Sequence, residues 1–472
     1  MSTTWSALRL ALLPLTLALG MLPASAQRAE PTPLPSPSST ASAPGPTGEA
    51  AAAQAAPAAP VSASGQRVYE VVRPRLLQVR TLLRGQDSQA GVGSGFLVSE
   101  QGLLITNYHV VSQFALEPSR FRLVYLTADG RQGALELLAI DVVHDLALLR
   151  PAEPGALAGR GALALRGDDA PMVRGERIFA MGNPLDVGFA VLEGSYNGLV
   201  ERAFVPTIFF GGSLSPGMSG GPALDEQARV IGVNVASRRD GEQISFLVPV
   251  AFARALLERS RDAKPITRPV YPTLATQLGA HQAALTERFL AQPWRSAGHA
   301  RYRIPVPQEV FMRCWGQSNP NELRGLQFER SDCAMDSRVY VSGELLTGFI
   351  TVRHEAYDGE RLGWLRFAHR YAKSFANEGF GAKSRWRTAP QCHERFVDRD
   401  GLPLRAVLCL QAHKKLEGLY DLDLLVATMD GETVGAQGRF DARGVSFDNA
   451  MRLATHYLEG FAWVDPAATG LR

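Results

Sequence analysis

Short apolar runs separated by Gly, Asp-Gly or Pro dominate the chain between residues 67 and 247. Examples lie at 95–98, 102–106, 121–126, 135–140, 177–181 and 230–235. Strands of this length with turn signals between them predict a β-barrel or sandwich rather than βαβ units. A helix is predicted over 249–261, because Val250, Ala253, Leu256 and Leu257 recur at the spacing of one helical face.

The pattern changes after residues 262–272, a segment with three prolines that we interpret as a linker. A helix is predicted over 273–292, followed by mixed strands and helices, so the second half is expected to be an α+β domain. Residues 365–375 and 451–461 match in register. They suggest two similar units, each a hairpin followed by a packed helix. Chance agreement between two amphipathic helices is the alternative.

The first residues have the pattern of a secretory signal peptide. Arg9 precedes an apolar stretch at 10–22, and Ala24-Ser25-Ala26 supplies small residues for cleavage before Gln27. An uncleaved anchor helix is the alternative, but the stretch is short and contains Pro14. Residues 27–66, mostly Pro, Ala, Ser, Thr and Gly, are expected to form a disordered tether. We therefore expect a periplasmic or secreted protein with no stable membrane span after processing.

The four cysteines all lie in the second half of the chain. An even number suits two disulfides in an oxidising compartment, and no pair has the C-x-x-C spacing of a zinc ribbon. The hypothesis of two similar units pairs Cys314 with Cys333 and Cys392 with Cys409. Other connectivities and four unpaired thiols stay open.

The length of the chain predicts more than one domain, and its net charge argues against nucleic acid as a partner. A chain of 472 residues exceeds what one core usually supports, so we expect one domain over 67–262 and another over 263–472. The formal net charge of +3 gives no electrostatic footprint for nucleic acid. The second domain's aromatic residues are expected to form its core rather than a ligand platform.

Three segments in the first domain carry residues of nucleophilic catalysis: 106–111 with His109, 144–149 with Asp145 and 216–222 with Ser219. A serine hydroxyl needs an imidazole to take its proton, and the imidazole needs a carboxylate to hold its tautomer. A lone histidine or aspartate is more often structural. Glycines on both sides of Ser219, however, place its hydroxyl on bare backbone and free two N–H groups for an oxyanion.

Together these segments resemble the trypsin-like serine peptidases, and more closely their HtrA/Deg branch. The His-Asp-Ser order and the Gly-x-Ser-Gly-Gly-Pro signature carry the resemblance, together with segments 93–96, 180–184 and 230–234. It covers residues 68–261 and implies an all-β, chymotrypsin-like double barrel with the site between the barrels. It also implies Ser219 as nucleophile, His109 as base and Asp145 as the orienting group. The N–H groups of Gly217 and Ser219 would form the oxyanion hole. Asp141 is the competing carboxylate.

Two departures from the branch concern the nucleophile loop. Met218 stands where the branch usually has asparagine, and Phe210-Gly211-Gly212 replaces the usual Thr-Asp-Ala. They leave open whether the oxyanion hole is formed at rest. Relatives of this branch also continue into PDZ domains, whose carboxylate-binding loop is not recognisable here, so the second half is expected to be a different module.

By the same resemblance, Ser213 lies at the base of the S1 pocket, with Val235, Ala236 and Ser245 as its walls. Without an aspartate at the base, we expect cleavage after small to medium apolar residues.

The expected function is therefore a serine endopeptidase that acts on exported or misfolded polypeptides, without cofactor or metal. His354-Glu355 lacks the second histidine of a zincin, and a strand rather than a helix is expected after Gly91–Gly95. The alternative is a binding or chaperone protein of the cell envelope on an inactive peptidase scaffold. A third possibility is that the second domain targets the enzyme to envelope material such as peptidoglycan, or sterically controls the cleft. The oligomeric state stays open.

Overall fold

The computed structural model describes residues 61–237, 244–319, 325–376 and 379–464. Residues 60–472 form one compact unit. The predicted signal peptide and almost all of the predicted tether lie outside the described residues. Helix α1 (Ala63–Val72) begins inside the end of that tether, a few residues before the expected boundary. In the described part of the chain, no helix combines the length and the apolar character needed to cross a membrane.

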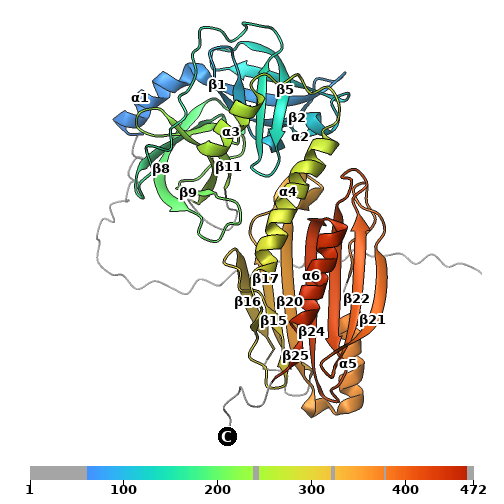
Figure 1. Cartoon of the computed structure of the whole chain (residues 1–472). Helices are drawn as coiled ribbons and strands as arrows, with labels where there is room; N and C mark the ends of the chain where they lie inside the picture. The colour runs from blue at the N-terminus through green and yellow to red at the C-terminus, as the bar shows by residue number, and fades with distance from the viewer. Residues whose placement is uncertain (1–60, 238–243, 320–324, 377–378, 465–472) are drawn as a thin grey trace, which may run out of the picture. The chain divides into compact units, whose positions relative to one another are not determined.

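Two closed six-stranded antiparallel barrels form the first half, which confirms the expected double-barrel fold (Figure 1). The first barrel consists of β1 (Leu76–Leu83), β2 (Gln89–Leu97), β3 (Leu104–Thr106), β4 (Phe121–Thr127), β5 (Gln132–Asp141) and β6 (Leu146–Pro151). The second consists of β7 (Arg177–Gly182), β8 (Ala190–Leu199), β9 (Ile208–Gly211), β10 (Pro222–Leu224), β11 (Val230–Ser237) and β12 (Ser245–Pro249).

Two helices accompany the barrels, and the sequence predicted one of them. Helix α3 (Val250–Ser260) is the helix expected at 249–261. Helix α2 (Tyr108–Leu116) was not expected, since its segment was associated with the preceding strand. Seven of its nine side chains are buried, so it lacks the wide polar face of an amphipathic surface helix.

The second half is built on one seven-stranded antiparallel sheet in the order β16-β17-β20-β24-β23-β22-β21. Its strands are β16 (Met312–Ser318), β17 (Gln327–Met335), β20 (Phe349–Asp358), β21 (Gln391–Arg399), β22 (Leu402–Ala412), β23 (Tyr420–Thr428) and β24 (Val434–Val445). A small separate hairpin pairs β18 (Val339–Ser342) with β19 (Leu345–Thr347). With its helices, this half has the α+β class expected.

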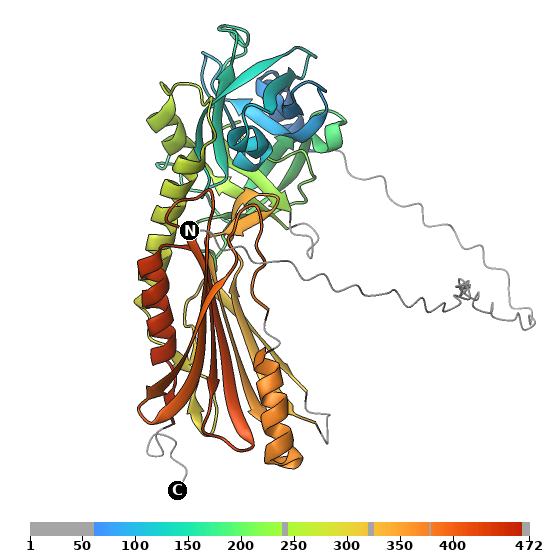
Figure 2. The same ribbon diagram turned by 90° about the vertical axis from the view of Figure 1, so that its right-hand side faces the viewer.

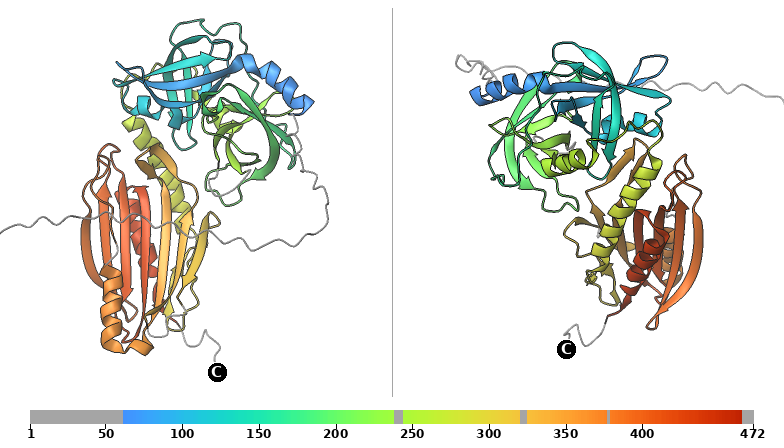
Figure 3. Two further views of the ribbon diagram at one scale, coloured as in Figure 1. Left: turned by 180° about the vertical axis from the view of Figure 1, so that it is seen from behind. Right: turned by 45° about the horizontal axis from the view of Figure 1, so that its top comes forward.

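Helices cover both faces of this sheet. Helices α4 (Tyr271–Leu290) and α6 (Phe447–Glu459) share one face, and α5 (Trp364–Ala376) lies on the other (Figures 2 and 3). Since side chains alternate along a strand, Leu424 faces the α4–α6 core while its neighbour Leu425 packs with α5.

Disulfides join Cys314 to Cys333 and Cys392 to Cys409, the pairs that the hypothesis of two units contains. Each joins directly opposed residues of a hairpin at one edge of the sheet. Cys333 faces the α4–α6 core, whereas Cys409 pairs with Asp423 and therefore faces the α5 side. Each disulfide thus lies on the face opposite the helix that follows its own hairpin in sequence.

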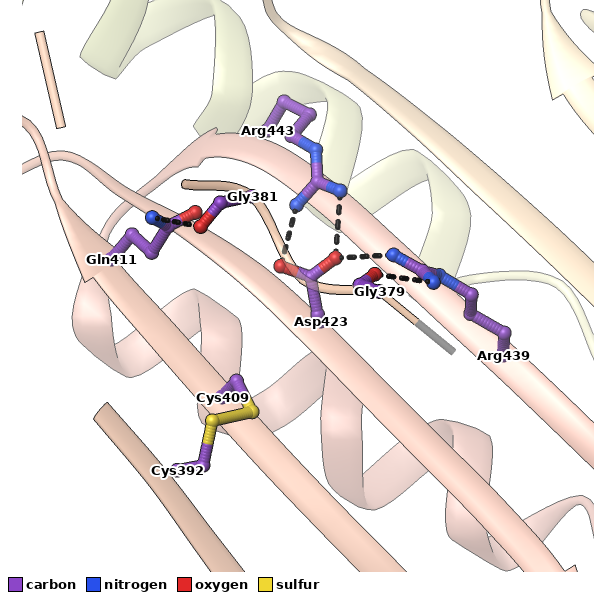
Figure 4. The surroundings of a disulfide bond; sticks show 8 residues. All are labelled: Gly379, Gly381, Cys392, Cys409, Gln411, Asp423, Arg439 and Arg443. Atoms are coloured by element: carbon purple, nitrogen blue, oxygen red, sulfur yellow. Dashed lines mark hydrogen bonds and ion pairs between the residues drawn. A yellow bond between two sulfur atoms is a disulfide. The ribbon is translucent and has the colours of Figure 1, made fainter. Parts of the chain in front are cut away.

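A buried charge network lies on the α5 side beyond the second disulfide (Figure 4). Asp423 is 1% exposed and accepts hydrogen bonds from Arg439 (2.8 Å) and Arg443 (2.7 Å). Burial raises the pKa of Asp423, but the bonds from Arg443 and the charges of both arginines outweigh it and hold the pKa below its usual value. These bonds run between β23 and β24, where Asp423 lies directly opposite Asp441.

Helix α4 connects the two halves through their cores. Leu274 and Leu278 pack in the core of the first barrel, whereas Leu285 and Phe289 pack in the core of the sheet. The barrel's core also includes Val341 and other side chains of the β18–β19 hairpin. The second half is thus packed against the barrel that carries His109.

Candidate active site

His109 lies in the first turn of α2, where the chain leaves β3. Its Nδ1 is 2.6 Å from Asp145 Oδ2, and its backbone N–H donates to Asp145 Oδ1 at 2.8 Å. The carboxylate therefore holds both the ring and the main chain of the histidine. This arrangement fixes Nδ1 as the protonated nitrogen and leaves Nε2 free to accept a proton.

Asp145 occupies the turn between β5 and β6 with a φ of 53°, a left-handed conformation that aspartate adopts more readily than most residues. Its carbonyl oxygen accepts hydrogen bonds from Asn107 Nδ2 (2.8 Å) and from the N–H of Tyr108 (3.1 Å). The start of α2 thus holds this turn through main-chain and side-chain bonds, so the carboxylate and the imidazole are mutually positioned.

The environment of His109 raises the pKa of its imidazole. Burial favours the neutral ring and lowers the pKa, but the charge of Asp145 and the hydrogen bond that Nδ1 donates to it favour the imidazolium. The balance lies above the ordinary value of 6.5. The ring is therefore a stronger base than a free histidine.

Asp141, the competing carboxylate, bonds His144 rather than His109. Its Oδ1 lies 2.9 Å from His144 Nδ1, and its Oδ2 accepts from Arg259 at 2.8 Å. Burial raises the pKa of Asp141, while the bonds from His144 and Arg259 lower it below its usual value. The structure thus brings Asp145, and not Asp141, to His109.

The glycines around Ser219 are required by close backbone packing. Gly217 has a φ of 93°, and a Cβ there would lie 2.5 Å from the carbonyl oxygen of Asn183. Gly220 has a φ of 85°, and a Cβ there would lie 2.2 Å from Ser94 O. Only glycine fits both the conformation and the space. The segments that carried the family resemblance therefore contact one another.

Two hydrogen bonds fix the peptide planes of the nucleophile loop. Leu185 N–H donates to Pro216 O (2.9 Å), and Ser94 Oγ donates to Gly217 O (2.7 Å). Because a trans peptide points its N–H away from its carbonyl, the N–H of Gly217 points away from Leu185. Within the described residues, neither the N–H of Gly217 nor that of Ser219 donates to a protein acceptor. Both are available to an oxyanion.

The two departures from the branch pattern lie in one apolar cluster. Met218 and Phe210 are fully buried together with Leu214 inside the second barrel. An apolar side chain before the nucleophile is thus accompanied by an apolar neighbour in the altered loop. This apolar packing supports the nucleophile loop from inside the second barrel. An asparagine at position 218 would need polar partners there.

The Ser219 hydroxyl donates to Val235 O at 2.7 Å. No hydrogen bond joins it to His109 among the described residues. Transfer of its proton to Nε2 therefore requires a rotation of the serine side chain, as is common in peptidases without a bound substrate.

The four residues expected at S1 have different positions. Ser213 is exposed and Val235 is half-buried. Ser245 is fully buried, and its Oγ accepts from Leu214 N–H at 2.9 Å, so it lies beneath the segment that carries Ser213. The side chain of Ala236 is outside the described residues.

Two residues next to the site were missed from the sequence. Ser94 was noted only as part of a motif, although its hydroxyl bonds the loop at Gly217 and accepts from Asn183 N–H (2.9 Å). Tyr340, on β18, lies with its ring 6.1 Å from that of His109 at 76°. No local signal marks Tyr340. In the part of the chain that is described, no group of three or more His, Cys, Asp or Glu residues could hold a metal.

Comparisons with known proteins support the resemblance. Residues 93–233 match the trypsin-like peptidase domain family. HhoA of Synechocystis sp., named as a serine protease, is 31% identical over 35% of this chain and 42% of its own length. A DegP-like protein of Halomonas elongata, named as a periplasmic serine endoprotease, is 30% identical over 39% of this chain and 38% of its own. Serine protease Do-like HtrA of Bacillus subtilis is 27% identical over 52% of this chain and 54% of its own.

This chain thus spans about half, or less, of the length of these relatives. The match to the family lies within the two barrels and includes His109, Asp145 and Ser219. Residues 93–233 are therefore a trypsin-like peptidase domain related to the HtrA and DegP serine proteases.

Proposed function

We propose that the protein is a serine endopeptidase in which Ser219, His109 and Asp145 act as a triad. The observation that carries this proposal is the 2.6 Å contact between Asp145 Oδ2 and His109 Nδ1. This contact uses one ring nitrogen of the histidine and leaves the other, Nε2, free to accept the serine proton. The family match over 93–233 supports it.

In this mechanism Ser219 Oγ rotates from Val235 O to His109 Nε2 and attacks the scissile carbonyl carbon. The new C–O bond forms as the proton moves to Nε2, and the N–H groups of Gly217 and Ser219 bind the resulting oxyanion. His109 then gives the proton to the leaving amine as the C–N bond breaks. Water, deprotonated by the same imidazole, attacks the acyl-enzyme, and the imidazolium returns a proton to Ser219 Oγ as the ester bond breaks.

We further propose that the substrates are exported or misfolded polypeptides and that the protein works in the periplasm or outside the cell. The signal-like N-terminus, the two disulfides and relatives named as periplasmic support this location. Ser213 and Val235 offer no carboxylate to an Arg or Lys side chain, which supports a preference for small to medium apolar residues before the cleaved bond. A peptide-library profile dominated by Arg or Lys would contradict this preference.

One observation favours the alternative, a binding or chaperone protein on an inactive scaffold: the Ser219 hydroxyl is bonded to Val235 rather than to His109. Labelling by an organophosphonate separates the two functions. We expect the full chain to be labelled and to cleave casein, Ser219→Ala to do neither, and both to share one far-UV circular dichroism spectrum. Ser195→Ala, on β8, is the matched control and should behave as the parent. An unlabelled parent chain would refute the peptidase.

A further inference from the structure

The β18–β19 hairpin of the second half lies against the helix that carries the histidine. Val339, Val341 and Leu345 are buried in the same core as α2. The Tyr108 hydroxyl, fully buried, donates to Val341 O at 3.0 Å. The hairpin is thus part of the structure that fixes the position of α2.

From this position the hairpin reaches the imidazole itself. The ring of Tyr340 meets that of His109 edge to face, with centroids 6.1 Å apart. Edge-to-face contacts of this kind stabilise one relative orientation of the two rings. Of the described side chains, Asp145 forms a hydrogen bond with Nδ1 of the ring, and Tyr340 packs against the ring. The ring is therefore held from the first barrel and from the second half.

The same segment also lines a large groove beside the site. The groove has a volume of about 920 Å³, at the upper end of the range of ligand-binding clefts. Asp145 and Val235 line it from the barrels, and residues 336–339 line it from the second half. Because Val235 O accepts the Ser219 hydroxyl, the groove begins next to the nucleophile.

The walls of the groove combine apolar and basic side chains. Phe209, Phe246 and Val248 contribute apolar surface. The arginines are Arg174, Arg202, Arg313 and Arg338, and the acidic residues besides Asp145 are Glu201 and Asp336.

These charges leave part of the groove open to acidic groups. Arg313 lies 3.0 Å from Asp336, and Arg174 lies 3.5 Å from Glu201. Arg202 and Arg338 have no acidic partner in the described part of the chain, and both are exposed. Two unneutralised guanidinium groups beside apolar surface suit a polypeptide that carries both apolar and acidic side chains.

We propose that the second half completes the substrate cleft: residues 336–339 form one wall of a groove for the flank of a bound polypeptide, and Tyr340 positions His109. This inference rests on the proposed peptidase function. A polypeptide whose scissile carbonyl lies at Ser219 extends one flank into the groove, where acidic side chains meet Arg202 and Arg338. The second half is then required for activity rather than an appendage of the peptidase.

The test uses the full chain and separates the two roles. Labelling by a small fluorophosphonate depends on Ser219 and His109 but does not reach the groove. Binding of fluorescein-labelled casein to a Ser219→Ala chain, followed by anisotropy at fixed salt, depends on the groove but not on catalysis. Together with kcat and KM for casein cleavage, these measurements distinguish positioning from substrate binding.

Replacing the two residues should have different effects. Tyr340→Ala should lower the labelling rate and kcat about tenfold, since a displaced base loses the geometry of proton transfer. Tyr340→Phe keeps the ring and should restore both. Arg338→Glu should weaken casein binding and raise KM about three- to tenfold, with the labelling rate unchanged. Arg361→Glu, an exposed arginine outside the groove, is the matched control.

Two outcomes would overturn the inference: Tyr340→Ala labelling as fast as the parent, or Arg338→Glu binding casein as tightly as Arg361→Glu. A parent chain that is never labelled would instead refute the proposed peptidase function. The anisotropy measurement would still decide whether the groove binds polypeptide, because it needs no catalysis.

Discussion

The two barrels differ in what supports them. The first barrel carries His109 and Asp145, and its core continues into α4 and the β18–β19 hairpin of the second half. The second barrel carries Ser219, and the cluster inside it, with Met218 and Phe210, contains only residues of that barrel and its loops. A further apolar core contains residues of both barrels, so the difference lies in the added contacts of the first barrel with the second half.

The kind of contact differs as well. At Ser219 the support is backbone against backbone, with glycines at each close approach and Ser94 bonding the loop. At His109 the support comes from the Asp145 carboxylate, from side-chain packing and from the bond of Tyr108 to Val341. Backbone packing tolerates few alternatives, whereas a packed side-chain interface permits adjustment. We therefore expect changes in the second half to affect the base more than the nucleophile loop.

The largest effect is expected from Asp145, the carboxylate that bonds His109. Asp145→Asn should lower kcat about 10³- to 10⁴-fold, because an amide at Nδ1 favours the wrong tautomer. It also removes the charge that raises the pKa of His109. Any residual activity should therefore persist to lower pH than in the parent, in which Asp145 raises the pKa of His109.

Asp141→Asn is the control for this comparison. It should leave kcat within a few-fold of the parent, because Asp141 bonds His144 and Arg259 rather than His109. The substitution should instead lower the free energy of unfolding. Folding lowers the pKa of Asp141, so this carboxylate stabilises the fold at pH values above its unfolded pKa, and the stabilisation is lost as the pH falls. Pre-steady-state kinetics would measure kcat, and urea unfolding would measure stability. Equal losses of kcat in Asp141→Asn and Asp145→Asn would contradict the assignment of Asp145.

A smaller effect is expected in the nucleophile loop. Ser94→Ala removes the donor to Gly217 O and should lower kcat about 10- to 100-fold, somewhat less than the loss of an oxyanion donor itself. KM should change little. The matched control is Ser99→Ala, which removes a hydrogen bond to Leu103 N–H in a turn of the same barrel. If both variants kept full kcat, the loop would not depend on Ser94.

The same difference explains which parts of the site could be predicted. The glycine-rich segments around Ser219 were recognisable because close backbone contact restricts the residue type at each position, and restricted residues form motifs. Strands β2 to β5, β7 and β11 were predicted for a similar reason, since turns between strands demand Gly and Asp. Helix α2 was missed because most of its side chains are buried, which leaves only a narrow polar face at His109 and Gln113.

The contact of Tyr340 with His109 left no sequence signal. Tyr108 and Val341, the residues next to this contact, are 233 positions apart. A tyrosine in a short hairpin is compatible with many environments, and only the tertiary fold brings it to the imidazole. The hairpin disulfides, by contrast, join cysteines 19 and 17 positions apart, where local pairing of strands suffices.

The smallest effect concerns the bond that joins the first barrel to the hairpin. Tyr108→Phe leaves Val341 O without its buried donor and should lower the free energy of unfolding by about 1 kcal/mol. Tyr371→Phe, which removes a bond to Ala436 O (2.7 Å) between α5 and β24, should cost a similar amount. Only Tyr108→Phe lies on the path from the hairpin to α2, so only it should slow labelling of Ser219, by a few-fold. If Tyr108→Phe and Tyr371→Phe lost equal stability and were labelled at equal rates, the first barrel would hold His109 without help from the second half. Neither barrel would then depend on the second half for the position of its catalytic residue.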